Sequence, residues 1–299
     1  MGDNKKAIIA IVLANFFFGT NVIAVKQITP ILVSPLSLTT LRVLGTAILF
    51  WSFFGTKKSI QPFTNKDIFL LILCAISGIS LNQALSIKGI SLTSPIHASL
   101  LILTTPITIS LLAALFLKEK LNQFKLFGLL LGIAGGALLI FSRDLSAINN
   151  GNQTKGDIYV ILSALCYSTY VLLMKPLASK FQSITILKWV FLIGSVISLP
   201  IGFSDVVIIK WGSFNFISWF CLIYIVFGAT FLAYLFMNYG ISKLGASRTS
   251  SFMYSQPFFA ATAAIIILNE SISLPKILAA ILIFSGVYVA NKTNYSNKL

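Results

Sequence analysis

The chain has 299 residues, of which 57% are hydrophobic and only 10% are charged, whereas about 25% of the residues in a typical soluble domain are charged. A soluble fold of this length cannot bury so much apolar surface, so the composition excludes a soluble globular protein and indicates a membrane protein. The formal net charge is +15. Because the lysines lie between and beside the apolar stretches, we interpret this charge as a signal for orientation in a membrane, with no nucleic-acid partner.

Ten apolar stretches follow one another along the chain. Runs of about 20 apolar residues are long enough to cross a hydrocarbon core of roughly 30 Å as helices. The runs are continuous rather than alternating, so we predict helices and not the strands of a barrel. The fold class that we predict is an all-α polytopic membrane protein with ten transmembrane helices. The predicted spans are 7–27, 36–54, 68–87, 96–117, 124–141, 158–174, 185–203, 214–239, 249–268 and 276–290.

The distribution of lysine and arginine predicts the orientation of these spans. Lys5 and Lys6 precede the first span as they would a signal peptide, but its apolar run is about 20 residues, longer than the usual 7–15, so we expect an uncleaved helix. Alternation across ten spans then places fifteen basic residues on one side and six on the other, with Arg42 inside the second span. Cationic loops stay in the cytoplasm, so both termini are expected to be cytoplasmic.

The two halves of the sequence resemble each other. At a shift of 151 residues, Gly89 meets Gly240, Pro106 meets Pro257 and Glu119 meets Glu270, and a shift of 149 aligns the first spans. Each half holds five predicted spans, an odd number, so the second half must enter the membrane from the opposite side. Such inverted repeats are typical of secondary transporters. We expect a first repeat over 7–143, a periplasmic linker over 144–155 and a second repeat over 156–292.

Several motifs recur in a specific order along nearly the whole chain. The first half contains ANFFFGTNVIAVK, a span-2 arginine after a proline, and PITISLLAALFLKEKL leading into GLLLGIAGGALLI. The second half contains SALCYSTYVLLMK and PFFAATAAIIILNESIS, followed by the glycine of FSGVYV. With these motifs the chain resembles the EamA-type family of the drug/metabolite transporter superfamily. The resemblance implies a bacterial inner-membrane carrier of small metabolites, often an exporter of amino acids or related compounds, with a cavity lined mainly by spans 1, 3, 4, 6, 8 and 9.

The chain departs from the family pattern in two places. The second repeat lacks the arginine of span 2, and span 4 carries His97 where family members usually have a small residue. Ser94 and Pro95 predict that a helix begins just before His97. The equivalent residue in the second repeat is Arg248. We expect these two basic residues to attract a substrate carboxylate, the alternatives being a packed or interfacial histidine and a snorkelling arginine.

No carboxylate is expected at membrane depth, because all seven lie in tails, loops or span ends. Carriers coupled to protons usually hold an ionisable residue there, so we favour facilitated export over proton antiport. The chain has one histidine, and its three cysteines lie inside spans without a C-x-x-C spacing. This composition predicts no metal site, no cofactor, no disulfide framework and no enzyme activity.

Polar residues near the middle of the spans are the candidates for a substrate site. Each polar group in hydrocarbon needs a partner, so it either joins helices or lines a wet cavity. The shift of 151 places Gln83 opposite Tyr234 and Thr105 opposite Gln256. The predicted site residues are Asn15, Thr20, Asn82, Gln83, His97, Thr105, Tyr167, Tyr234, Asn238, Tyr254 and Gln256. Phe16, Phe17 and Phe18, together with Tyr167, are expected to form an apolar wall and gate.

Other conspicuous residues have structural interpretations. Pro106 and Pro257 are expected to bend their spans. Arg42 is expected to bind carbonyl groups or a polar neighbour such as Asn21 or Gln27. Lys26 and Lys175 are expected to snorkel, with substrate anchoring as the alternative. Gly128, Gly132 and Gly136 form a stripe for close helix packing, either within the repeat or in a dimer.

The sequence therefore predicts a carrier that moves a small polar or amphipathic metabolite by alternating access. Its partners are the small-molecule substrate and membrane lipid, and the chain is a monomer or a homodimer. The alternative from a different class is a membrane protein that assembles partners and transports nothing.

Overall fold

The computed structural model describes residues 2–56, 61–117, 123–141, 152–244, 251–269 and 272–296. Helices form all the regular structure of these residues, with no strand among them. Six helical segments in the described ranges are long and apolar enough to cross a membrane. The helical prediction is thus confirmed, and six of the ten predicted spans meet this criterion. They are Lys5–Ile28, Pro35–Phe54, Asn65–Leu92, Gln153–Ala178, Ser183–Val207 and Phe216–Gly240.

The helices of the two halves follow the same order. Of the other four predicted spans, 96–117 and 249–268 fall on interrupted helices, and 124–141 and 276–290 each fall on one helix. The first half contains α1 (Gly2–Ile28), α2 (Pro35–Phe54), α3 (Asn65–Cys74), η1 (Ala75–Leu81), α4 (Asn82–Leu92), α5 (Pro95–Ile102), α6 (Thr105–Leu117) and α7 (Gln123–Phe141). The second half contains α8 (Gln153–Ala178), α9 (Ser183–Val207), η2 (Trp211–Ser213), α10 (Phe216–Ile223), η3 (Tyr224–Leu232), α11 (Ala233–Leu244), η4 (Ser251–Ser255), α13 (Gln256–Leu268) and α14 (Leu274–Ser296).

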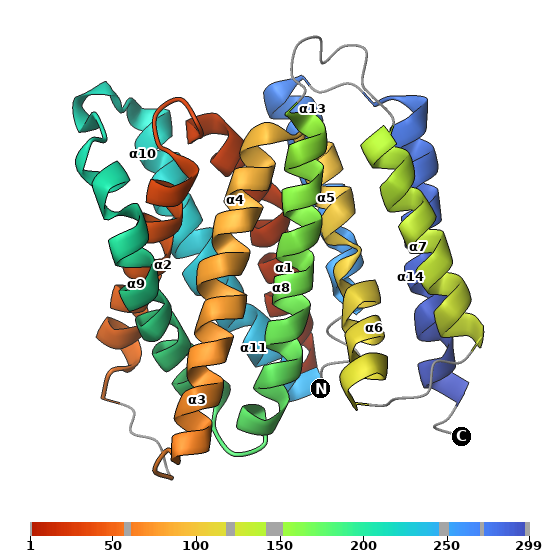
Figure 1. Ribbon diagram of the computed structural model, residues 1–299, viewed down its shortest axis with the longest axis horizontal. Helices are drawn as coiled ribbons and strands as arrows, with labels where there is room; N and C mark the ends of the chain where they lie inside the picture. The colour runs from red at the N-terminus through yellow and green to blue at the C-terminus, as the bar shows by residue number, and fades with distance from the viewer. Residues whose placement is uncertain are drawn as a thin grey trace.

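The helices lie side by side in one bundle (Figure 1), with α2 and α9 at one edge and α7 and α14 at the other. The start of α1 and the end of α14 lie at the same, lower end of the bundle in this view (Figure 1). Large apolar side chains point outward from it: Phe216 is 85% exposed and Ile266 is 72% exposed. An outer surface of this kind suits contact with lipid and not with water.

Helix ends and interruptions fall where the sequence places caps and prolines. Ser94 accepts a hydrogen bond from the backbone N–H of His97, and Pro95 opens α5, as expected. In span 4 the helix breaks after Ile102 and resumes at Thr105, directly before Pro106, and α13 begins at Gln256, directly before Pro257. A proline has no backbone N–H, so it cannot donate the helical hydrogen bond to the carbonyl four residues earlier. The two interruptions lie at prolines 151 residues apart, where the sequence predicts bends.

The same shift relates the π-helical segments. Segment η1 ends at Leu81 and α4 begins at Asn82, while η3 ends at Leu232 and α11 begins at Ala233. Packing repeats as well: an added Cβ at Gly89 would meet Val160, and one at Gly240 would meet Ile11, the residue that a shift of 149 makes equivalent to Val160. Both observations fit a protein built from two copies of one unit.

Equivalent helices of the two halves pack against each other in opposite directions. In the α2–α9 pair, Thr40 near the start of α2 donates to the carbonyl of Ser198 at 3.1 Å, while Trp51 near its end donates to the carbonyl of Lys188 at 3.2 Å. At the other edge, α7 and α14 make the same kind of pair: Gly135 lies against Ile283, and Gly286 lies against Gly128. The two halves therefore meet along antiparallel pairs.

The glycine stripe of span 5 has a different role from the predicted ones. A Cβ at Gly286 would lie 2.6 Å from the Gly128 carbonyl oxygen and 2.8 Å from the Gly132 backbone nitrogen. Helix α14 belongs to the second half, so Gly128 and Gly132 serve contact between the halves. The prediction of packing within one repeat is wrong for these two residues. The reason is that α7 lies at the edge of the bundle beside its own counterpart (Figure 1).

Candidate functional site

Gln83 and Tyr234 lie where the two halves meet. Gln83, the second residue of α4, directs its side-chain nitrogen at the Tyr234 hydroxyl, 3.5 Å away, and the two side chains are 5% and 8% exposed. The Tyr234 ring is packed edge-on against Phe18 and Phe191, with ring centroids 5.7 and 5.3 Å apart. Positions related by the repeat can touch only near the axis that relates the halves. This contact therefore marks the axis with two polar groups.

A second polar contact joins α1 to α13. The side-chain nitrogen of Gln256 donates to the side-chain oxygen of Asn15 at 2.7 Å, and the Asn15 nitrogen donates to the Ile11 carbonyl at 2.8 Å. Asn15 is fully buried and Gln256 is 8% exposed. Gln256 is the first residue of α13 and directly precedes Pro257. Two of the predicted site residues are thus in direct contact.

Four of the other predicted residues donate to backbone carbonyls. Asn82 on α4 donates across to Ser163 at 2.8 Å, and Asn238 donates to Tyr234 one turn earlier at 2.7 Å. Thr20 and Thr105 donate to carbonyls of their own spans, and the Thr20 hydroxyl also contacts the Tyr224 hydroxyl. Such bonds satisfy polar groups inside an apolar bundle. The Tyr167 ring lies 5.6 Å from the Tyr170 ring, and the side chain of Tyr254 lies outside the described part of the structure.

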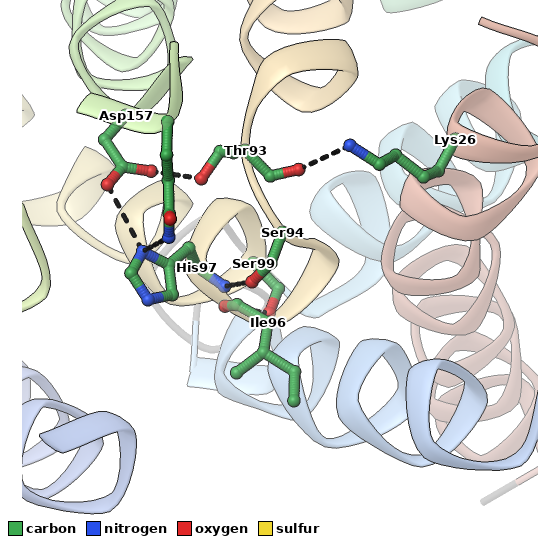
Figure 2. A network of polar contacts seen from close by, with 8 residues as sticks. Lys26, Thr93, Ser94, Ile96, His97, Ser99 and Asp157 are labelled. Atoms are coloured by element: carbon green, nitrogen blue, oxygen red, sulfur yellow. Dashed lines mark hydrogen bonds and ion pairs between the residues drawn. The ribbon is translucent and has the colours of Figure 1, made fainter. Parts of the chain in front are cut away.

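His97 belongs to a separate cluster at one end of the bundle, drawn in Figure 2. Its ring nitrogen Nδ1 lies 3.2 Å from Oδ2 of Asp157 and 3.3 Å from the side-chain nitrogen of Gln153. The other carboxylate oxygen of Asp157 contacts the Thr93 hydroxyl. His97 and Asp157 are each 1% exposed. Helix α5 positions the histidine, α8 the aspartate, and the turn after α4 the threonine.

The expectation that the carboxylates lie in tails, loops or span ends holds for Asp157 and Asp67, but the structure shows that both side chains are buried. Asp157 lies in the second turn of α8, yet α4 and α5 cover it completely. Asp67, in the first turn of α3, is only 2% exposed and forms an ion pair with Lys180 at 2.8 Å. The sequence gives no signal for the His97–Asp157 contact, because the two residues lie 60 positions apart on different predicted spans.

Lys26 performs a task that was not among its predicted roles. Its ammonium group donates to the carbonyl of Ser91 at 3.1 Å and to that of Thr93 at 2.8 Å (Figure 2), where α4 ends. The C-terminus of a helix carries partial negative charge and unpaired carbonyls, so a cation is stabilising there. Lys26 thus ties α1 to α4 next to the His97 cluster. Lys175 is exposed, and Arg248 lies outside the described residues.

Arg42 is buried between α2 and the π-helical segment η3. Its Nε donates to the Thr230 hydroxyl at 2.5 Å and its terminal nitrogen faces the Ala229 carbonyl at 3.4 Å. Both predicted partner classes, a carbonyl group and a polar neighbour, are confirmed, although the polar neighbour is Thr230 and not Asn21 or Gln27. The Thr230 hydroxyl in turn donates to the carbonyl five residues earlier at 2.7 Å, as the wide turns of a π-helix allow.

One buried polar atom on α1 is available for another partner. The side-chain oxygen of Asn21 is buried and has no hydrogen-bond partner among the residues that the structure describes. Within those same residues no cluster of three histidine, cysteine, aspartate or glutamate side chains could hold a metal ion. The chemistry that this arrangement offers is hydrogen bonding by amides and hydroxyls next to aromatic rings.

We expect the Asn15–Gln256 contact to show coupling in a double-mutant cycle. Asn15→Leu or Gln256→Leu alone leaves one buried amide without its partner, which costs about 1–3 kcal/mol of unfolding free energy. The double variant removes both amides, so its loss should be smaller than the sum of the single losses. Denaturant titration of the purified protein in detergent measures the three values. Strictly additive losses would contradict a direct contact between the two side chains.

Comparisons with known proteins agree with the two-repeat architecture. A model of the EamA-like transporter family matches residues 5–141 and 154–292. Uncharacterized transporter YyaM of Bacillus subtilis (strain 168) is 25% identical over 188 residues, which make up 60% of this chain and 59% of YyaM. Uncharacterized transporter YetK of the same organism is 22% identical over 247 residues, 83% of this chain and 75% of YetK.

A plant relative and a solved structure extend the similarity. The WAT1-related protein At3g02690, chloroplastic, of Arabidopsis thaliana is 25% identical over 280 residues, 92% of this chain and 67% of the plant protein. A crystal structure of a protein 17% identical in sequence superposes with a TM-score of 0.62 and covers 96% of both chains. The solved structure shares the fold of this chain.

Proposed function

Because the chain belongs to the EamA-like transporter family, we propose that it is a ten-span carrier that moves small polar metabolites across the bacterial inner membrane by alternating access. The two halves, 7–143 and 156–292, are inserted in opposite directions and joined by the external linker 144–155. Both termini are cytoplasmic. The substrates are amino acids or related compounds, and the direction is export.

The packing of equivalent helices supports the inverted insertion. The α2–α9 and α7–α14 pairs run antiparallel, and the start of α1 and the end of α14 lie at one end of the bundle (Figure 1). Two copies of a five-span unit inserted in opposite directions give this arrangement. In such carriers the substrate site lies near the midplane, where the copies meet.

The observation that carries the proposal is the Gln83–Tyr234 contact. Equivalent residues of the two halves face each other there with an amide and a hydroxyl. Asn15 and Gln256 add two further amides, and Phe18 adds an aromatic wall. Amides, hydroxyls and aromatic faces can bind a small molecule with both polar and apolar parts. We assign the substrate site to this set, with Asn82, Asn238, Thr20, Thr105, Tyr167 and Tyr254 around it.

One observation favours a membrane protein that only assembles partners. Asn82, Asn238, Thr20 and Thr105 all donate to backbone carbonyls, which is how polar side chains join helices in a protein that transports nothing. The family relationship and the polar contact at the axis favour the carrier. A measurement of substrate flux distinguishes a carrier from a protein that only assembles partners.

The test combines metabolite profiling with reconstituted flux. The medium of cells with and without the protein is compared, and every amino acid or related compound that changes is then assayed in liposomes containing the purified chain. The proposal expects flux of at least one such compound, above that of empty liposomes and lowered in the Gln256→Leu variant. Wild-type liposomes that are no more permeable than empty ones, for every compound that changed in the medium, would contradict it.

A further inference from the structure

Arg42 is a buried cation without a carboxylate partner among the described residues. Its side chain is 4% exposed, and a guanidinium stays charged in proteins. A buried charge is costly unless an opposite charge compensates it. The three carboxylates whose side chains the structure describes contact other residues, namely Asp67 with Lys180, Asp157 with His97 and Asp205 with Ser34. None of these three therefore neutralises the charge of Arg42.

We infer that Arg42 binds the carboxylate of the substrate, and that the carrier takes monocarboxylates with an apolar chain, whether or not they also bear an amino group. This inference rests on the proposed function and deepens it, because it names the group by which the site at Gln83 and Tyr234 recognises its substrate. A guanidinium presents parallel N–H donors that match the two oxygens of a carboxylate.

The guanidinium lies beside the axis pair of Gln83 and Tyr234. Its Nε donates to the Thr230 hydroxyl at 2.5 Å, and Tyr234 follows Thr230 by four residues. The charge of Arg42 interacts with the Tyr234 hydroxyl, and α2 packs against α4, which carries Gln83. The Tyr234 oxygen faces the Gln83 amide nitrogen as an acceptor, so its own hydrogen can be donated to an anion. These side chains thus bring several hydrogen-bond donors to one place.

Two contacts at this place are long. A terminal nitrogen of Arg42 lies 3.4 Å from the Ala229 carbonyl oxygen, and the side-chain nitrogen of Gln83 lies 3.5 Å from the Tyr234 hydroxyl. Hydrogen bonds of this type are usually about 2.7–3.2 Å long, so both contacts are weak. A carboxylate bound between these groups would replace two weak bonds with short, charge-assisted ones.

Thr46 adds a donor on the same face of α2. It follows Arg42 by four residues, and residues at this spacing are neighbours on a helix surface. Its hydroxyl is fully buried and has no hydrogen-bond partner in the described part of the chain. A shift of 149 makes Ser195 its equivalent in the second half, where the hydroxyl donates to the Leu192 carbonyl at 2.7 Å. The Thr46 hydroxyl is therefore available to the carboxylate that Arg42 binds.

The second half presents an aromatic ring where the first presents the cation. A shift of 149 makes Phe191 the equivalent of Arg42, and Phe191 packs edge-on against the Tyr234 ring with centroids 5.3 Å apart. Phe18 lies against the same ring at 5.7 Å. A molecule with one carboxylate and an apolar chain suits a site with a cation on one side and aromatic rings on the other. A second carboxylate would lie against aromatic rings without a cation.

A matched pair of probes tests the requirement for a carboxylate. Isocaproate and isocaproamide share one branched apolar chain and differ in bearing a carboxylate or a neutral amide. Isothermal titration calorimetry with the purified protein in detergent measures both affinities. Isocaproate should bind at least tenfold more tightly, because charge-assisted hydrogen bonds are about twice as strong as neutral ones. Equal affinities, or no binding of isocaproate, would overturn the inference.

Two substitutions test whether this binding occurs at Arg42. Arg42→Gln removes the charge and retains an amide donor, and should lower the affinity for isocaproate at least tenfold. Thr46→Val removes a hydroxyl that makes no hydrogen bond within the described structure, so it should weaken binding about fivefold without lowering stability. Ser195→Ala, the control at the equivalent position, should bind as the wild-type protein does. The site is overturned if Thr46→Val or folded Arg42→Gln retains wild-type affinity, or if Ser195→Ala loses as much as Thr46→Val.

These binding measurements need no transport. If liposome flux fails while isocaproate binds through Arg42, the proposed carrier function fails and the carboxylate site stands. If flux is found and isocaproate binds no more tightly than isocaproamide, the carrier stands and this inference falls.

Discussion

Replacing Gly286 with leucine is expected to lower the free energy of unfolding by about 3 kcal/mol. Even a Cβ at this position would lie 2.6 Å from the Gly128 carbonyl oxygen and 2.8 Å from the Gly132 backbone nitrogen. Both atoms belong to the main chain of α7, so no side-chain rotation can relieve the overlap. The helices α7 and α14 would have to separate, and the contact between the halves at this edge would open. Denaturant titration in detergent measures the change.

Gly212 provides the matched control for this substitution. An added Cβ there meets no heavy atom within 4 Å. Gly212→Leu should therefore change the free energy of unfolding by no more than about 0.5 kcal/mol. Equal unfolding curves for the two leucine variants would show that α7 and α14 are not in close contact in the folded protein.

Replacing Tyr234 with phenylalanine should reduce transport about tenfold while leaving stability almost unchanged. The substitution removes only the hydroxyl group and keeps the ring against Phe18 and Phe191. At 3.5 Å the hydroxyl forms a weak bond with Gln83, so its loss costs the fold less than about 1 kcal/mol. If the hydroxyl binds substrate, the loss of one hydrogen bond is worth about 1.4 kcal/mol, or a factor of ten.

Flux and denaturant titration on the same preparation separate the two effects. Tyr288, which is 70% exposed on α14, provides the control, because Tyr288→Phe removes an identical hydroxyl far from the axis. Its flux should equal that of the wild-type protein. If Tyr234→Phe also transports at the wild-type rate, the Tyr234 hydroxyl does not bind substrate.

The features of the fold that could be predicted from sequence depend on local rules. Continuous apolar runs specify helices whatever packs around them. Pro106 and Pro257 interrupt their spans by the same local mechanism, and Ser94 caps α5 because its side chain accepts from the backbone three residues on. The repeat makes Gln83 and Tyr234 equivalent positions, whereas their contact depends on the two spans meeting at the axis.

The features that could not be predicted depend on which helices become neighbours. Asp157 looks exposed in the sequence because it follows a polar linker, yet α4 and α5 bury it against His97. Lys26 lies at the end of a predicted span, the usual position of a snorkelling residue. Its ammonium group instead binds carbonyls at the end of α4, 64–67 positions away. The partner of Arg42, Thr230, lies 188 positions away in a π-helical segment that no sequence pattern indicates.

The most direct test of the central claim is water access to the junction of the halves. Asn82, half-buried at the start of α4 beside Gln83, is replaced with cysteine in a variant without the three native cysteines. The protein in sealed vesicles is then exposed to a membrane-impermeant thiol reagent from each side in turn. A carrier with a substrate path between inverted halves predicts modification from both sides. A cysteine that resists the reagent from both sides, in protein that is otherwise folded, would contradict the claim.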